Sequence, residues 1–296
     1  AGLPVSPAHR QGGGGAHSSM MEVGFGSYAM GWAAGPQPAG AARADANAVL
    51  ARAKALGYRR VQLADNVSLH HFSEDALLAL AARARQDGVA LEAGGRGLTD
   101  ENLHRHLAVA TSLGSWMLRF VIDGPGYEPT HAEALALLRR AVSRLREARV
   151  VLAIENHDRF GAVELADLVA ACDSPWVGIC FDTANSYGAG DDTLSALRSL
   201  APHTVNVHLK DVSIRRVPSQ QGFLIDGTPL GEGSLPIEEV ISTLSRSERC
   251  RTATLEHWVP PEPDFACTLI KEEAWCVRST ALLRSWFPNS FVSHTP

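Results

Sequence analysis

The stretch Glu22-Val23-Gly24-Phe25-Gly26-Ser27-Tyr28 distinguishes between two folds that the rest of the chain allows. It begins a pattern in which short strand-like runs alternate with longer Ala-, Leu- and Arg-rich runs at helical spacing, which is typical of parallel strands. An open dinucleotide-binding sheet would place a Gly-x-Gly-x-x-Gly turn directly after its first strand. Gly24 and Gly26 instead lie inside the expected strand, and no such turn follows them. The sequence therefore favours a closed (β/α)8 barrel.

The same strand-and-helix unit occurs eight times. The expected strands cover residues 22–28, 59–65, 89–94, 116–122, 150–156, 177–183, 204–210 and 252–258. The expected helices lie near residues 41–56, 73–87, 100–113, 131–148, 162–172, 192–200, 236–246 and 265–286. Eight units match the usual size of a TIM barrel, whose active site lies at the C-terminal ends of the strands. We expect an α/β fold with a single barrel domain over residues 21–290, preceded by a flexible tail or expression remnant at residues 1–20.

The composition excludes several classes of protein. The 296 residues are 45% hydrophobic and 20% charged, which is enough apolar material for a large core. A formal net charge of -5 disfavours a broad nucleic-acid-binding face, and no apolar run reaches the ~18 residues that a membrane span needs. The five cysteines are odd in number and lack a Cys-x-x-Cys pair, so neither a disulfide framework nor a cysteine zinc site is expected. A reduced, cytoplasmic location fits this pattern.

Ionisable residues end four consecutive expected strands. They are Glu155, Asp182, His208 and Glu256, each placed after an apolar run. Taken singly, each has an ordinary explanation, because strand-end Glu residues are usually solvated, Asp often caps a helix, and His on an apolar strand is often a core residue. Their equivalent positions on neighbouring strands instead predict one metal site. Three carboxylates and one imidazole suit Mn²⁺ or Mg²⁺, with Co²⁺ or Zn²⁺ as alternatives.

Two cationic residues near these strand ends are candidates for substrate binding. Lys210 would be a buried cation beside the substrate, or would pair with Asp211 or Glu256. Arg119 lies inside an expected strand, where a charge needs a partner, so it either pairs with a site carboxylate or contacts the substrate.

Three further substrate-binding candidates lie elsewhere along the chain. Trp258 would form an apolar wall under a sugar ring or simply pack, and Glu92 would add a polar contact. Residues 213–235 form a segment longer than the usual barrel loop, which predicts either a lid or a partner-docking insertion. Arg216 in this segment would bind an anionic group or face solvent.

Four motifs carry a resemblance to a known family. They are Ile154-Glu155-Asn156-His157, Cys180-Phe181-Asp182-Thr183-Ala184-Asn185, His208-Leu209-Lys210-Asp211 and the turn Gly231-Glu232-Gly233. In order and strand placement they resemble the xylose isomerase-like TIM barrels, and more narrowly the sugar (phosphate) isomerase and epimerase branch that also contains endonuclease IV. The resemblance runs from Glu22 to about Trp286.

The resemblance implies a divalent-metal-dependent isomerase or epimerase of carbohydrate metabolism. A small ketose or oxo-sugar would be converted by proton transfer through a metal-bound enediolate. Glu155 and Glu256 would act as the acid/base pair while touching the metal, and His157 is a second candidate base. The runner-up is a lyase of the same fold, either a dehydratase or an enzyme that cleaves 3-oxo-glycosides, which His157 and the long segment 213–235 support. A non-catalytic sugar-binding barrel and an endonuclease IV-like phosphodiesterase are more distant alternatives.

Departures from the family pattern narrow these expectations. Asn185 stands where several epimerases carry a His, and it is a candidate substrate contact. The expected second and third strands lack the histidines of endonuclease IV, so we expect no nucleic-acid partner. The helix expected at 265–286 would either pack on the barrel or form a homo-oligomer interface.

Overall fold

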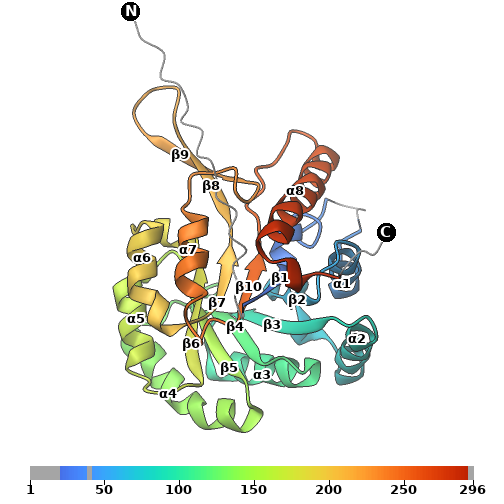
Figure 1. Ribbon diagram of the computed structural model, residues 1–296. Coiled ribbons are helices and arrows are strands. Elements are labelled where there is room, and N and C mark those ends of the chain that lie inside the picture. Colours follow the sequence, from blue (N-terminus) through green and yellow to red (C-terminus); the bar gives the residue numbers. More distant parts are fainter. Residues whose placement is uncertain (1–20, 39–41, 293–296) are drawn as a thin grey trace, which may run out of the picture.

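Eight parallel strands close into a barrel in the computed structural model, which describes residues 21–38 and 42–292 (Figure 1). They are β1 (Glu22–Gly26), β2 (Arg60–Leu63), β3 (Ala90–Arg96), β4 (Met117–Val121), β5 (Val151–Glu155), β6 (Val177–Asp182), β7 (Thr204–Leu209) and β10 (Thr252–Leu255). Around the barrel the order is β1-β10-β7-β6-β5-β4-β3-β2. This closure confirms the predicted (β/α)8 TIM barrel. The tail expected at residues 1–20 lies outside the described residues.

A helix follows each barrel strand and covers the outside of the barrel (Figure 1). The helices are α1 (Ala46–Ala55), α2 (Glu74–Gln86), α3 (Asp100–Leu113), α4 (His131–Ala148), α5 (Ala162–Ala170), α6 (Thr193–Leu200), α7 (Ile237–Leu244) and α8 (Phe265–Trp286). Short 3-10 helices occupy Ser27–Met30, Asp65–Val67, Leu69–His71, Asn185–Tyr187, Ala201–His203 and Pro288–Ser290. Helix α1 begins later than expected because the Asp45 carboxylate caps it, accepting a 2.9 Å hydrogen bond from the backbone N–H of Ala48.

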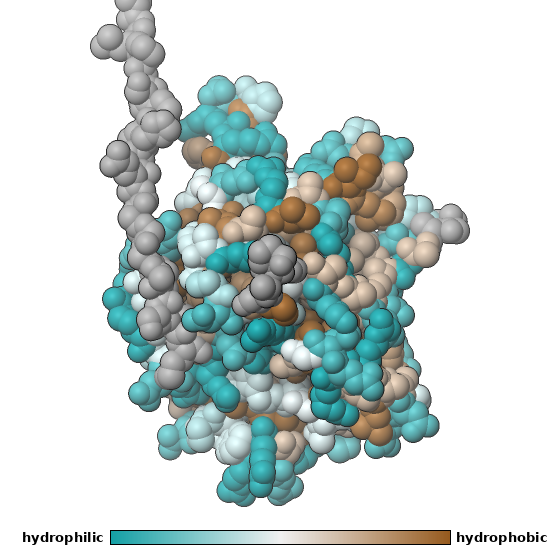
Figure 2. Space-filling view, turned by 45° about the vertical axis from the view of Figure 1, so that its right-hand side comes forward, coloured by the Kyte–Doolittle hydropathy of each residue, from teal (hydrophilic) through white to brown (hydrophobic). Residues whose placement is uncertain are grey.

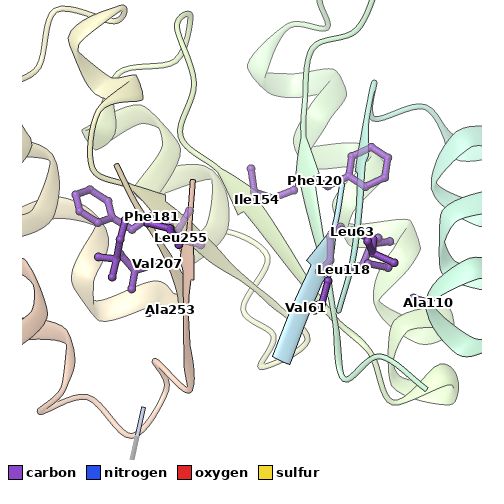
Figure 3. Packing of buried hydrophobic residues seen from close by; sticks show 14 of the residues in the cluster. Val61, Leu63, Ala110, Leu118, Phe120, Ile154, Phe181, Val207, Ala253 and Leu255 are labelled. Carbon is purple, nitrogen blue, oxygen red and sulfur yellow. The ribbon is translucent and has the colours of Figure 1, made fainter. Parts of the chain in front are cut away.

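Side chains alternate along the barrel strands, so that one set points outward to the helices and the other set points into the barrel. Apolar side chains such as Leu63, Phe120 and Phe181 belong to the buried core that joins the strands to the helices (Figure 3). The side chain of Gln62, one residue before Leu63, instead contacts Thr254 of β10, the second strand from β2 around the barrel. The barrel interior is thus largely polar near its C-terminal end, and the apolar packing lies outside it.

The segment predicted as a long loop at 213–235 contains an antiparallel hairpin. It consists of β8 (Asp211–Arg216) and β9 (Phe223–Thr228), and it projects from the barrel beside the C-terminal strand ends (Figure 1). The Asp211 carboxylate closes its base by accepting backbone N–H bonds of 3.0 Å from Gly231 and 2.9 Å from Gly233. A Cβ at position 233 would lie 2.2 Å from the Asp211 carboxylate, so only glycine fits this turn.

Helix α8 packs on the barrel along one side and exposes apolar residues along the other. Trp275 is buried, whereas Ile270 is 70% exposed and Val277 is 48% exposed. Figure 2 shows apolar side chains gathered on the upper right of the molecule, where α8 lies. Among the described residues, no helix is both long and apolar enough to cross a membrane.

Glu272 of α8 ties this helix to the segment after the first strand. Its two carboxylate oxygens accept backbone N–H bonds of 2.6 Å from Trp32 and 3.0 Å from Ala33. Burial raises the pKa of Glu272 to about 7, although both backbone N–H bonds lower it. Because the folded protein then holds this proton more tightly than the unfolded chain does, stability is lost as pH rises through the folded pKa.

We therefore expect the contribution of Glu272 to the free energy of unfolding to decrease between pH 4.5 and pH 7, the usual and the raised pKa of Glu272. A Glu272→Gln variant keeps an oxygen acceptor without the titration, so the difference in stability between the two proteins should move in favour of the variant as pH rises across this range. Denaturant unfolding at several pH values measures this difference. The control is Glu273→Gln, which removes a half-exposed neighbour paired with Arg52. An unchanged pH slope in Glu272→Gln would contradict the assignment.

Candidate active site

The four predicted metal-binding side chains converge at the C-terminal end of the barrel interior. Asp182 and His208 are directly paired in the register of β6 and β7. The His208 Nδ1 atom lies 3.4 Å from Glu256 Oε2, 3.6 Å from Glu155 Oε2 and 3.7 Å from Asp182 Oδ2. All four side chains are buried. Three carboxylates and one imidazole therefore surround a single small volume.

Unsatisfied polar atoms show that this volume suits a divalent cation. Nδ1 of His208 and Oε1 of Glu256 are buried and have no hydrogen-bond partner among the described residues. Such groups are costly to bury unless something else binds them. Cys180 also lies near the cluster, but its thiol donates to the Asn206 side-chain oxygen at 3.1 Å. Without the thiol, the cluster offers carboxylate oxygens and one imidazole nitrogen, a donor set that suits a divalent cation.

Gln62 of β2 determines which nitrogen of His208 faces the carboxylates. The Gln62 Oε1 atom lies 2.7 Å from His208 Nε2. The amide nitrogen of Gln62 lies among three oxygen acceptors, at 3.2 Å from Glu92, 3.4 Å from Asn206 and 3.3 Å from Thr254. With its nitrogen so placed, Gln62 can only accept from Nε2–H. When the ring is neutral, as a metal ligand must be, its lone pair is therefore on Nδ1, the atom that points at the carboxylates.

Two buried cations balance the carboxylates of the cluster. Arg119 donates to Glu155 and, at 2.9 Å, to Asp65. Lys210 donates to Asp182 at 2.6 Å, and its Nζ lies 2.9 Å from Glu256 Oε2. For both Arg119 and Lys210, an ion pair with a carboxylate was one of the two predicted alternatives, and the structure shows such ion pairs.

These charges keep Asp182 ionised. Burial alone would raise the pKa of Asp182, but the nearby charges of Lys210 and His208 outweigh burial and lower the pKa to about 2. In the same way, His208 and Lys210 lower the pKa of Glu256 despite its burial. Both carboxylates are therefore available as anionic ligands.

A pocket of about 410 Å³ opens above the cluster. It is lined by Tyr28, Arg96, Arg119, Glu155, His157, Asp158, Asn185, Lys210, Glu256, His257 and Trp258. Seven predicted site residues are in this set, namely Glu155, Glu256, His157, Lys210, Asn185, Arg119 and Trp258. Asn185 does not face the pocket freely, because its amide donates to Glu155 Oε1 at 2.8 Å. Asp182 and His208 lie in the ligand cluster and do not line the pocket.

Two predicted substrate contacts, Glu92 and Arg216, do not line the pocket. Glu92 is buried within the barrel, where it accepts from the indole N–H of Trp116 at 2.8 Å and supports Gln62. Arg216 lies on the exposed hairpin, with its guanidinium 4.5 Å from the ring centroid of Phe223. In this structure Glu92 therefore contacts Gln62 rather than the pocket. Arg216 faces solvent, which was the second of the two alternatives predicted for it.

Two residues that shape the site were not predicted from the sequence. Gln62 was not assigned to the metal site, although it holds His208. Arg96 was not considered because the third strand was expected to end at residue 94, whereas β3 continues to Arg96. Because two consecutive glycines, Gly94 and Gly95, are typical of a turn, the sequence did not indicate that the strand continues past them. A Cβ at Gly95 would lie 2.5 Å from the His106 ring, so glycine is required there within a strand.

Comparisons with known proteins agree with this architecture. The xylose isomerase-like TIM barrel family matches residues 50–285. The chain is 31% identical to a 3-oxo-isoapionate decarboxylase of Pectobacterium atrosepticum over 258 residues, covering 86% of this chain and 92% of that protein.

Solved structures show the same fold at lower identity. A xylose isomerase domain protein from Planctomyces limnophilus has a TM-score of 0.67 and 18% identity, covering 91% of this chain and 99% of that one. A D-psicose 3-epimerase has a TM-score of 0.67 and 14% identity, covering 90% of this chain and 99% of that one. A Mycobacterium smegmatis xylose isomerase-like TIM barrel protein, solved in complex with magnesium, has a TM-score of 0.63 and 15% identity, covering 90% and 99%.

We expect Gln62→Leu to weaken Mn²⁺ binding by roughly 10- to 100-fold, because it removes the acceptor that orients His208. Gln62→Glu keeps an oxygen acceptor and should bind Mn²⁺ more tightly than Gln62→Leu. Titration of free Mn²⁺ by electron paramagnetic resonance measures the dissociation constants directly. Gln86→Leu, the same substitution at an exposed position of α2, is the control and should leave the affinity unchanged. Equal affinities in the wild type and Gln62→Leu would refute the role of Gln62.

Proposed function

The chain belongs to the xylose isomerase-like TIM barrel family, and we propose that it is a metal-dependent lyase that removes CO₂ from a 3-oxo sugar acid. The observation that carries this proposal is the 31% identity to a 3-oxo-isoapionate decarboxylase along 92% of that relative. The pocket of about 410 Å³ has the size of a small-molecule site. The proposed substrate is therefore a small sugar acid. The cytoplasmic location and the oligomeric state stay predictions.

The proposed reaction needs no oxidant and no second substrate. The bond between C2 and the carboxylate carbon breaks, CO₂ leaves, and the electron pair of that bond moves toward the 3-oxo oxygen to give an enolate. A proton is then delivered to C2, which yields the ketone. A divalent cation held by Glu155, Asp182, His208 and Glu256, for which we favour Mn²⁺ or Mg²⁺, would supply a Lewis acid for the charge that develops on this oxygen.

Lys210 is the residue to which we assign proton delivery. It is an ammonium that lines the pocket, and Asp182 and Glu256 hold it there. Burial alone would lower the pKa of Lys210, but both carboxylates outweigh burial and raise it, so the group is an ammonium in the protein without bound metal. It therefore carries the proton that the enolate needs, and its positive charge also stabilises developing negative charge in the pocket.

Epimerisation or isomerisation is the second candidate, because the carboxylates of Glu155 and Glu256 both line the pocket as the resemblance implies. Epimerisation needs two groups that exchange protons with opposite faces of one carbon. Here Glu155 accepts from Arg119 through one oxygen and from Asn185 through the other. Decarboxylation requires only one proton delivery, which this arrangement supports better.

We expect Mn²⁺-loaded protein to release labelled CO₂ from 3-oxo-isoapionate, or from another 3-oxo aldonic acid, carrying ¹³C in the carboxylate. Mass spectrometry of the gas and of the ketone product measures the reaction, and chelator-treated protein is the control. A product of unchanged mass, with substrate C–H exchanged for deuterium from solvent, would favour the epimerase instead. No CO₂ from any 3-oxo acid would refute the decarboxylase.

We expect Lys210→Met to lower kcat by roughly 100-fold or more, because proton delivery and its stabilising charge are both lost. Steady-state kinetics on the 3-oxo acid measures this change, together with the Mn²⁺ content of the variant. Lys54→Met is the matched control, since Lys54 is exposed and pairs with Asp87. Full activity in a metal-loaded Lys210→Met protein would remove Lys210 from the reaction.

A further inference from the structure

We propose that Arg96 binds the carboxylate of the substrate and that His157 holds Arg96 in place for this purpose. The inference rests on the proposed function, and it adds the site for the group that leaves as CO₂. Arg96 is the last residue of β3, and its side chain lines the pocket. The backbone there is held by Asn102, whose side-chain amide donates to the Arg96 carbonyl at 2.5 Å.

Arg96 differs from the other two pocket cations in lacking a carboxylate partner. Arg119 pairs with Asp65 and Glu155, and Lys210 contacts two carboxylates in the same way. Among the described residues, no carboxylate oxygen forms an ion pair with Arg96, and its Nε is buried without a hydrogen-bond partner. A partly buried guanidinium with unused donors is a binding site for an anion.

His157 and Asp158 orient the Arg96 side chain. The Arg96 Nη2 atom lies 3.2 Å from His157 Nε2, and His157 Nδ1 lies 3.2 Å from an Asp158 carboxylate oxygen. Arginine has no acceptor, so His157 Nε2 accepts from Arg96, and the Nδ1 proton lies on the side of the Asp158 carboxylate. His157 is then a neutral acceptor rather than the base that the resemblance implies. We assign it as a positioning residue.

The chemistry of the guanidinium favours a carboxylate as its ligand. Its planar fork matches the two oxygens of a carboxylate and binds them through paired N–H bonds. A 3-oxo acid carries its carboxylate and its carbonyl on either side of one carbon. The pocket offers a free cation at Arg96 and, at its floor, the carboxylate and imidazole cluster suited to a metal. These two features match the two polar groups of such a substrate.

Direct binding tests this assignment without requiring turnover. The probes are D-erythronate, which is a stable hydroxy acid, the neutral polyol erythritol, and erythritol phosphate. Calorimetric titration of Mn²⁺-loaded wild type should show tighter binding of erythronate than of erythritol. Arg96→Met should lose roughly 10- to 100-fold in erythronate affinity, the usual range for a charge-assisted contact. Its erythritol affinity and its Mn²⁺ content should not change.

Companion variants separate a binding role from a structural one. Arg96→Lys keeps the charge and should retain part of the erythronate affinity. His157→Gln keeps a hydrogen-bond acceptor and should bind erythronate better than His157→Leu. Arg216→Met is the matched control, because it removes an arginine of the exposed hairpin, and it should bind erythronate like the wild type. An equal erythronate affinity in Arg96→Met and wild type would overturn the proposal, as would an Arg96-dependent preference for erythritol phosphate.

Kinetics distinguish failure of this inference from failure of the proposed function. If CO₂ is released, Arg96→Met should raise KM by roughly 10-fold or more without a matching loss of kcat, because the carboxylate loses its charge as CO₂ forms and the anchor therefore stabilises bound substrate more than the transition state. An unchanged KM would overturn the anchor and leave the decarboxylase standing. If no 3-oxo acid releases CO₂ but erythronate binding still depends on Arg96, the anchor stands and the decarboxylase falls.

Discussion

Three carboxylates buried around one small volume are the constraint on which the site depends. Glu155, Asp182 and Glu256 all approach the Nδ1 atom of His208 within 3.7 Å. Burying like charges this closely is unfavourable unless cations compensate them. Arg119 and Lys210 supply two positive charges, but unsatisfied atoms of Glu256 and His208 remain. These unsatisfied atoms make the cluster a candidate site for a divalent cation.

The barrel makes this arrangement stable by separating its polar and apolar contacts. Core residues such as Phe120 and Phe181 pack between strands and helices, so the polar interior does not have to supply the hydrophobic stability of the fold. Within the interior, Gln62 links His208 to Glu92, and Glu92 is held in turn by Trp116. This chain of hydrogen bonds fixes the ligand atom of His208 before any ion binds, which reduces the cost of ordering the site.

The three cations that line the pocket differ in their partners, and this difference affects which reaction the site can support. Lys210 and Arg119 form ion pairs with carboxylates of the site, whereas Arg96 forms none within residues 21–38 and 42–292. Glu155 has both oxygens engaged, which makes it a weak candidate for one of two exchanging bases. One free cation, one protonated lysine and one oxygen-rich ligand cluster suit a substrate that arrives with a carboxylate and leaves without it.

The barrel and the four ligand candidates could be predicted from the amino-acid sequence, because both follow from local periodicity and from the rule that parallel strands end at one face. The partners of those residues depend on how the strands are arranged in space. Gln62 and His208 are far apart in the chain, and closure of the barrel brings them together. The extension of β3 to Arg96 was hidden because two glycines resemble a turn. From its place in the segment 213–235, Arg216 was predicted either to bind an anionic group or to face solvent. The pairing of β8 with β9 places it in solvent. Contacts across a closed barrel depend on the register of every strand, which no single stretch of sequence specifies.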